Sequence, residues 1–150
     1  LIVAMSLSPY ISYNGTAREA MTFYKGVFGG EITFSTYGEF DDTLDGHAAM
    51  RIMHAELITD ADFILLGSDT PDGAEFDPST RISIAIFGNE EATMAKYYES
   101  LLAAGGNTKM PLEKAPWGDS FGMVTDKFGV EWMFNISGVN HSDYHRPDHN

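Results

Sequence analysis

The chain of 150 residues contains no cysteine, which excludes disulfide bonds and thiolate chemistry. This composition is compatible with a reducing cytoplasm, where we expect the protein to be located. No apolar run approaches the roughly 20 residues that a membrane-spanning helix needs. The opening "LIVAM" lacks the basic region and the length of a secretory signal. The sequence therefore predicts a soluble protein with no membrane partner.

Basic residues are scarce, with 9 Lys and Arg against 22 Asp and Glu, for a net charge of −13. A surface this negative repels phosphate backbones, so we expect no nucleic-acid partner. The same field attracts cationic ligands, although a solvated acidic surface that aids solubility is the simpler interpretation.

Two similar halves follow each other along the chain. The first begins with the alternating strand "SPYISYNG" and a helix in "TAREAMTFYKGVFGG" that Gly29-Gly30 closes. Three β-type runs follow, "EITFSTYGEF", "HAAMRIMHAELI" and "DFILLGSD". Residues 70–80, rich in turn formers, read as a linker.

The same order of elements restarts after the linker. "RISIAIFG" is a predicted strand, and "NEEATMAKYYESLLAAGG" is a predicted helix with Asn89 as its N-cap. The β-type runs "NTKMPLE", "SFGMVT" and "VEWMFNIS" complete the half. Each half thus reads β-α-β-β-β, and echoes such as "FYKGVFGG" and "YYESLLAAGG" suggest duplication.

We therefore predict an α+β fold in which one domain, residues 8–137, holds two βαβββ modules. Module 1 covers about 8–69 and module 2 about 81–137, with a C-terminal tail at 138–150. One helix covers only one face of each sheet, so the other face is expected to line a cleft between the modules or to meet another chain.

These motifs, together with "MHAEL", "LLGSD" and "WGDSFGMVTDKFGVEWMFNI", make the chain resemble the PhnB-like branch of the vicinal oxygen chelate superfamily, the glyoxalase and bleomycin-resistance fold. The resemblance runs from about Ser8 to Ser137. It implies paired modules that form a cupped, incomplete barrel, usually in a homodimer. It leaves function open, because the superfamily includes metal-dependent lyases, isomerases, dioxygenases and thiol transferases as well as proteins that sequester drugs.

The resemblance also implies four places for metal ligands, one on the first and one on the last strand of each module. These places fall on Pro9 or Tyr10, Leu65, Arg81 and Met133. None of these side chains suits a hard divalent ion, so we predict that the usual metal site is absent. A Gly-rich loop for S-adenosylmethionine is also missing, and no cofactor is predicted.

His54 and Glu56 in "MHAEL" share one face of a predicted strand, because side chains alternate. Three interpretations stay open: a polar or proton-transfer role in the cleft, a structural hydrogen-bonded pair, and part of a relocated metal site. We favour the first, narrowly.

Arg81, Trp117 and Met133 complete the candidate ligand-binding residues. Arg81 could bind a carboxylate or phosphate of a ligand. A salt bridge within the protein, with Glu131 for example, is the more common arrangement. Trp117 precedes a strand and is expected to form an aromatic wall or to pack in its loop. The tail carries histidines at 141, 145 and 149. Because Pro147 interrupts any helix there, we expect this segment to have no specific function or to bind metal only adventitiously.

The leading hypothesis is a homodimeric protein that binds an unidentified small molecule without the superfamily's metal. The first alternative is a metal-dependent lyase or dioxygenase with a relocated site around His54 and Glu56. The second alternative is a dimeric protein that sequesters a cationic drug. Whether any reaction is catalysed is left open, because this fold is shared by unrelated chemistries.

Overall fold

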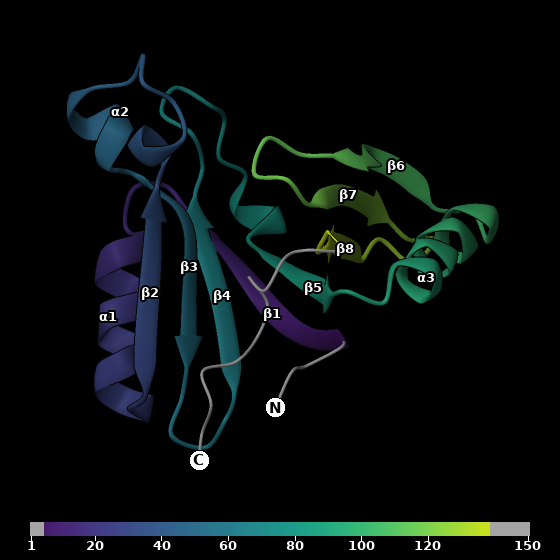
Figure 1. Ribbon diagram of the computed structural model, residues 1–150, viewed down its shortest axis with the longest axis horizontal. Coiled ribbons are helices and arrows are strands. Elements are labelled where there is room, and N and C mark those ends of the chain that lie inside the picture. The colour runs from purple at the N-terminus through teal and green to yellow at the C-terminus, as the bar shows by residue number, and fades with distance from the viewer. Residues whose placement is uncertain (1–4, 139–150) are drawn as a thin grey trace. The chain divides into compact units, whose positions relative to one another are not determined.

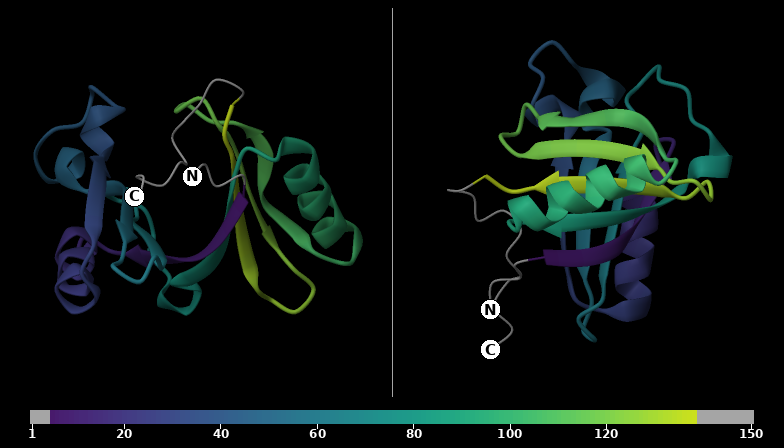
Figure 2. Two further views of the ribbon diagram at one scale, coloured as in Figure 1. Left: turned by 60° about the horizontal axis from the view of Figure 1, so that its bottom comes forward. Right: turned by 90° about the vertical axis from the view of Figure 1, so that its right-hand side faces the viewer.

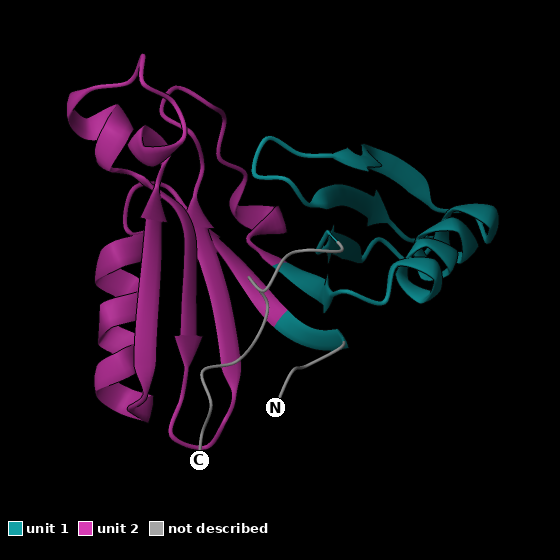
Figure 3. Ribbon diagram, viewed as in Figure 1, with its two compact units in different colours: residues 1–8, 83–150 teal, residues 9–82 magenta. Residues whose placement is uncertain are grey.

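The computed structural model describes residues 5–138 and divides the chain into two compact units (Figure 3). The first unit consists of residues 9–82. The second unit joins the described residues 5–8 to residues 83–138. The tail histidines of the sequence analysis lie outside the described residues.

The first unit contains four strands and helix α1 (Figure 1). Strand β1 (Met5–Tyr13) begins in the second unit and ends in this one. The strands are hydrogen-bonded in the order β2-β3-β4-β1, with β1 and β4 parallel and the other pairs antiparallel. The remaining elements are α1 (Ala17–Phe28), β2 (Glu31–Thr36), η1 (Tyr37–Glu39), α2 (Gly46–Met50), β3 (Ile52–Ile58), β4 (Ile64–Asp69) and η2 (Pro78–Thr80).

The second unit repeats this plan in the order β5-β8-β7-β6, with β5 and β8 parallel. Its elements are β5 (Ile82–Gly88), α3 (Glu91–Ala103), β6 (Asn107–Lys114), β7 (Ser120–Thr125) and β8 (Glu131–Ile136). The predicted α+β fold of two βαβββ modules is confirmed. None of the described helices is long and apolar enough to span a bilayer.

Each unit has its own hydrophobic core between its long helix and one face of its sheet, and Figure 2 shows both helices against their sheets. Met21 and Ala17 of α1 are fully buried against Ala55 and Leu57 of β3. Met94 and Tyr98 of α3 pack against Val124, Phe134 and Ile136. Other apolar residues of the two helices, Phe23, Val27 and Tyr97, are exposed.

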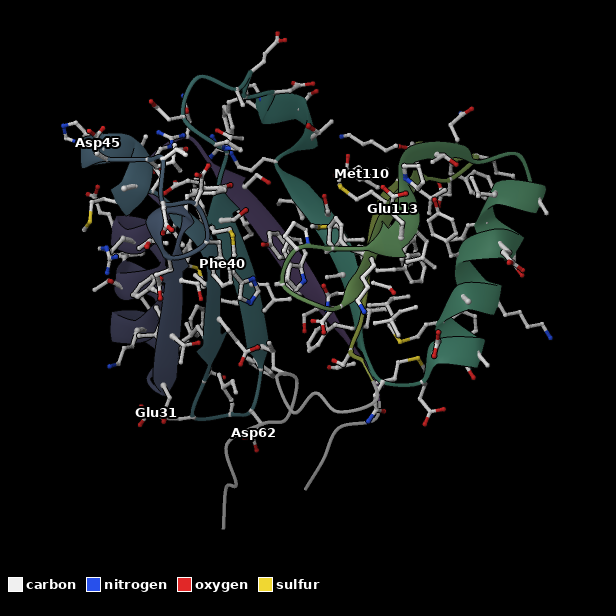
Figure 4. The ribbon with its side chains drawn as sticks, turned by 45° about the horizontal axis from the view of Figure 1, so that its top comes forward. Glu31, Phe40, Asp45, Asp62, Met110 and Glu113 are labelled. Carbon is white, nitrogen blue, oxygen red and sulfur yellow. The ribbon has the colours of Figure 1, made fainter. Side chains whose placement is uncertain are left out.

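Glycine ends α1 where the sequence predicted it. Gly29 and Gly30 have φ values of 71° and 101°, a region that L side chains rarely adopt. A Cβ on Gly29 would also collide with the Asp60 carboxylate, and one on Gly30 with the Ile58 carbonyl. The pair thus turns the chain tightly into β2, which starts at Glu31 (Figure 4).

Three local predictions are wrong. The run 47–58 is not one strand, because residues 46–50, with two alanines, form the short helix α2 before β3 begins at Ile52. Strand β2 ends at Thr36, where Glu39 accepts hydrogen bonds from the Thr36 backbone and side chain and tightens a 3₁₀ turn. The N-cap of α3 is Glu90 rather than Asn89.

Candidate functional site

The sheet of the first unit has one face without a long helix, which we call the open face. Alternation along β4 and β3 places Leu65, Ala55 and Leu57 against α1, so Leu66 and Glu56 point the other way. Pair register then puts Tyr10, Leu66, Glu56 and Thr33 in one row across the four strands. His54 and Glu56 therefore share the open face, as the sequence indicates.

Tyr10, His54 and Ser68 form a hydroxyl–imidazole cluster on this open face. The Tyr10 hydroxyl lies 3.3 Å from His54 Nδ1, and the two rings are tilted with centroids 6.0 Å apart. Ser68 is hydrogen-bonded to the Tyr10 side chain. Three separate strands, β1, β3 and β4, supply the three residues, so only the folded sheet assembles the cluster.

Burial sets the protonation states in this cluster. Desolvation lowers the pKa of His54 from 6.5 to about 4, so the imidazole is neutral at physiological pH. Desolvation also raises the pKa of Tyr10, an effect that its hydrogen bond to Ser68 partly offsets. The cluster is consequently uncharged and can hydrogen-bond a ligand without separating charge.

Tyr37 sits close to this cluster and is anchored separately. Its hydroxyl donates to the Asp69 backbone carbonyl over 2.6 Å. Burial, followed by the nearby Tyr10 and Asp69, raises the pKa of Tyr37 to about 12. Tyr37 is therefore a protonated phenol whose position is fixed by the end of β4.

The buried carboxylate of Asp69 holds the end of the sheet together. Its Oδ1 accepts from the backbone N–H groups of Gly15 and Ala17 at 2.8 and 3.0 Å, and its Oδ2 accepts from that of Ile52 at 2.9 Å. One side chain thus ties the start of α1 to β3 and β4. Arg51 adds a second tie, because its Nε–H donates to the Thr70 backbone carbonyl at 2.8 Å.

The open face of the second unit carries different side chains. Ala85, Met133 and Met123 form one row across β5, β8 and β7, and Phe87, Asn135 and Phe121 form the next. Met133 therefore points away from α3, because Phe134 and Trp132 pack on the α3 side.

Trp117, Asp119, Phe121 and Asn135 form an amide–aromatic cluster beside these rows. Trp117 Nε1–H donates to Asn135 Oδ1 at 3.1 Å, and Asn135 Nδ2–H donates to Asp119 Oδ2 at 2.9 Å. The Trp117 ring meets the Phe121 ring edge to face, with centroids 5.7 Å apart. The hydrogen bond to Asn135 and the ring contact with Phe121 thus hold the Trp117 side chain in place.

Glu131 lies on the same open face and has two partners from its own unit. Ser83 Oγ–H donates to its Oε1 at 2.7 Å, and Lys109 Nζ lies 2.5 Å from its Oε2. Arg81, which the sequence analysis paired with Glu131 as one alternative, precedes β5 and places its guanidinium over the Phe76 ring at 5.3 Å. Arg81 therefore stays a candidate anion-binding residue.

Register corrects one of the implied metal-ligand positions. The hairpins β3–β4 and β7–β8 have turns of equal length, residues 59–63 and 126–130, so Leu66 rather than Leu65 corresponds to Met133. Leu65 packs against α1 instead. A shift of one residue reverses the face of a strand, which sequence alignment alone did not detect.

The donor set at these positions does not fit a divalent metal. A protonated phenol (Tyr10), a hydrocarbon (Leu66) and a thioether (Met133) offer no hard anionic or imidazole ligand. Within residues 5–138, no group of three or more His, Cys, Asp or Glu side chains gathers closely enough to hold a metal ion.

Comparison with known proteins now identifies the class. Residues 7–134 match the Glyoxalase/Bleomycin resistance protein/Dioxygenase superfamily, and the chain belongs to this superfamily. Protein YjdN of Escherichia coli (strain K12) is 29% identical over 151 residues, covering 88% of this chain and 95% of YjdN.

Among solved structures, at least one matches this chain closely enough to show a shared fold. A crystal structure of a Staphylococcus aureus protein matches with a TM-score of 0.66 and 21% identity, covering 92% of this chain and 99% of that one. A PhnB protein from Bacillus cereus is 26% identical, with 87% of this chain and 98% of that chain covered and a TM-score of 0.37. The family match confirms the predicted resemblance at the level of the glyoxalase and bleomycin-resistance superfamily.

Sequence reasoning missed four members of the two clusters: Ser68, Asp119, Phe121 and Asn135. It also considered Tyr10 only as a failed metal ligand. The available signal was alternation, since Ser68 is two positions beyond Leu66 and Asn135 two beyond Met133. The pairing of β1 with β4, which brings Tyr10 to His54, has no signal in a single sequence.

Proposed function

We propose that the protein binds a small organic molecule on the open face of a unit's sheet, without the superfamily's metal. On the first unit the proposed contacts are Tyr10, His54 and Glu56. The open face of the second unit, considered by itself, offers Trp117 and Met133. The carrying observation is the neutral His54 ring hydrogen-bonded to Tyr10 on a sheet face that no long helix covers. Such a face offers apolar area with a few directional polar groups, which is typical of ligand sites.

The chemistry of the donor set supports binding without a metal. Because Leu66 and Met133 occupy the last-strand positions, a divalent ion would be held by too few ligands. Elemental analysis of tag-free, chelator-washed protein should find well below one Zn, Ni, Fe or Mn per chain. One equivalent of metal that is lost in His54→Leu would favour a relocated metal site instead.

A ligand screen tests the proposal directly. Thermal-shift or ligand-observed NMR measurements should compare neutral organic metabolites with cationic glycopeptides. The cationic arm addresses the drug-sequestering alternative, which the net charge of −13 favours. We expect neutral compounds to raise the melting temperature, and we expect His54→Leu to reduce that rise at least several-fold.

A matched control separates binding from general damage. Glu99→Gln changes an exposed residue of helix α3 that is not part of either open face. It should therefore leave the ligand-induced rise in melting temperature intact. If hits bind equally well to His54→Leu and to Met133→Ala, neither open face is the site and the proposal fails.

We further propose that the protein is a cytoplasmic homodimer. Helix α1 exposes Phe23 and Val27, at 66% and 59%, on the side opposite its buried Met21 and Ala17. Apolar side chains at i and i+4 form a patch suited to an interface. Light scattering at micromolar concentration should give twice the chain mass, and Phe23→Asp should shift it toward the monomer.

A further inference from the structure

His54 makes one hydrogen bond within the described part of the chain, and that bond is to Nδ1. A neutral imidazole carries one hydrogen, on Nδ1 or on Nε2, and the partner of one nitrogen determines which. If the Tyr10 hydroxyl donates to Nδ1, the hydrogen must be on Nε2. The direction of this single bond therefore decides what His54 presents on the open face.

Two features make Tyr10 the donor. First, the raised pKa keeps the Tyr10 phenol protonated, so it has a hydrogen to give. Second, a phenol O–H is a stronger hydrogen-bond donor than a neutral imidazole N–H, and an unprotonated imidazole nitrogen is a stronger acceptor than a phenol oxygen. With His54 Nδ1 at 3.3 Å, the bond is therefore favoured when Tyr10 donates.

We propose that Tyr10 is a positioning residue that keeps His54 in the tautomer with its hydrogen on Nε2. The site then presents an N–H donor instead of a general base, and it binds its ligand through an acceptor oxygen such as the carbonyl of a neutral organic molecule. The tautomer assignment stands without any ligand, whereas the ligand class rests on the proposed function.

The chemistry of the surroundings agrees with an acceptor ligand. An Nε2–H group cannot accept from an ammonium or a guanidinium, so a cation gains no hydrogen bond from His54. A fully anionic ligand is opposed by the net charge of the protein. A neutral molecule with a polarised C=O group satisfies both conditions.

The tautomer is measurable by long-range ¹H–¹⁵N NMR on protein labelled with ¹⁵N-histidine. The His54 signals are assigned by their loss in His54→Gln. At neutral pH we expect the pattern of a neutral ring with a protonated Nε2 and an unprotonated Nδ1. In Tyr10→Phe the Nδ1 partner is gone, so the two tautomers should mix and both ¹⁵N shifts should move toward their average.

Tyr97→Phe is the matched control, because it removes the same hydroxyl from an exposed residue of α3. It should leave the His54 pattern unchanged. A His54 ring protonated on Nδ1, a charged ring at neutral pH, or a pattern that Tyr10→Phe leaves unaltered would each overturn the tautomer assignment.

The ligand class is tested with two matched probes, benzamide and benzylammonium chloride. Both carry the same ring, but only benzamide has an acceptor oxygen. We expect millimolar benzamide to move the His54 Nε2–H signal downfield, and benzylammonium to leave it in place. Movement by benzylammonium alone would overturn the acceptor assignment, and no movement by either probe would count against both the ligand class and the proposed function while the tautomer result stands on its own.

Discussion

The open faces of the two units occupy equivalent positions in the βαβββ module but carry different side chains. Equal hairpin turns make His54 correspond to Phe121, Leu66 to Met133 and Ser68 to Asn135. The first unit thus has an imidazole, a hydrocarbon side chain and a hydroxyl where the second has an aromatic ring, a thioether and an amide. The difference teaches that one scaffold can present unrelated side chains on its open faces, so the chemistry of each face must be argued from its own residues.

The two units also differ in what holds the end of the sheet. Asp69 in β4 corresponds by register to Ile136 in β8, and both are buried, at 2% and 4% exposure. Asp69 accepts three backbone hydrogen bonds, whereas Ile136 packs in the core beneath α3. One unit is therefore locked by a polar group and the other by hydrocarbon contact.

The largest expected effect comes from giving both positions the same residue. Asp69→Leu leaves three backbone N–H groups, two of them in buried hydrogen bonds, without their acceptor, so we expect a loss of about 3–5 kcal/mol in the free energy of unfolding. Ile136→Leu keeps volume and polarity and should cost less than about 1.5 kcal/mol. Urea denaturation of both variants measures the contrast, and equal losses would show that Asp69 has no special role.

A second substitution, His54→Phe, gives the first unit the residue that the second unit has at the corresponding position. In wild type, the His54 pKa falls to about 4 on folding, so the unfolded chain binds more protons below about pH 6.5. Stability is therefore fully present above about pH 6.5 and is lost as the pH falls toward 4. Allowing for its partial exposure, we expect this group to account for about 2 kcal/mol of that loss.

His54→Phe, which copies Phe121, removes this group and should flatten the profile between about pH 6.5 and 4 by the same amount. Carboxylate protonation affects both proteins alike, so the difference between the two profiles isolates His54. Urea midpoints measured across that pH range give the comparison. Parallel profiles would mean that His54 is not desolvated in the folded protein.

The smallest effect concerns the ion pair on the second open face. Lys109→Met removes the partner of Glu131, whose side chain is 11% exposed against 46% for Lys109. Because Ser83 still donates to Glu131 and Lys109 is partly solvated, we expect a loss of about 0.5 kcal/mol. The loss should shrink in high salt, since screening weakens the wild-type pair.

The order and type of the long elements could be predicted from the sequence. The apolar spacing indicated α1 and α3, because each helix buries one face, and a β-type run was recognised for each described strand. The short helix α2 was missed because five residues are too few to show a helical period. The end of β2 was missed because it depends on the Thr36–Glu39 contact.

The site was predictable only in part. Alternation placed His54 and Glu56 on one face of a strand without any tertiary information. The partners Tyr10 and Ser68 could not be found in the same way, because they reach His54 through strand pairing across more than 40 residues in the case of Tyr10. The pKa of His54 was equally hidden, since it arises from burial in the folded sheet.

Because strand β1 is divided between the two units, the units differ in how much of the chain each needs before it can fold. The first unit is one continuous stretch, residues 9–82, whereas the core of the second needs Met5 together with residues beyond 83. Closing so long a loop carries an entropic cost that a local hairpin avoids. During synthesis the second unit therefore cannot complete its sheet until β8 has been made. Its first residues, at the start of β1, nevertheless leave the ribosome before any other part of the described fold.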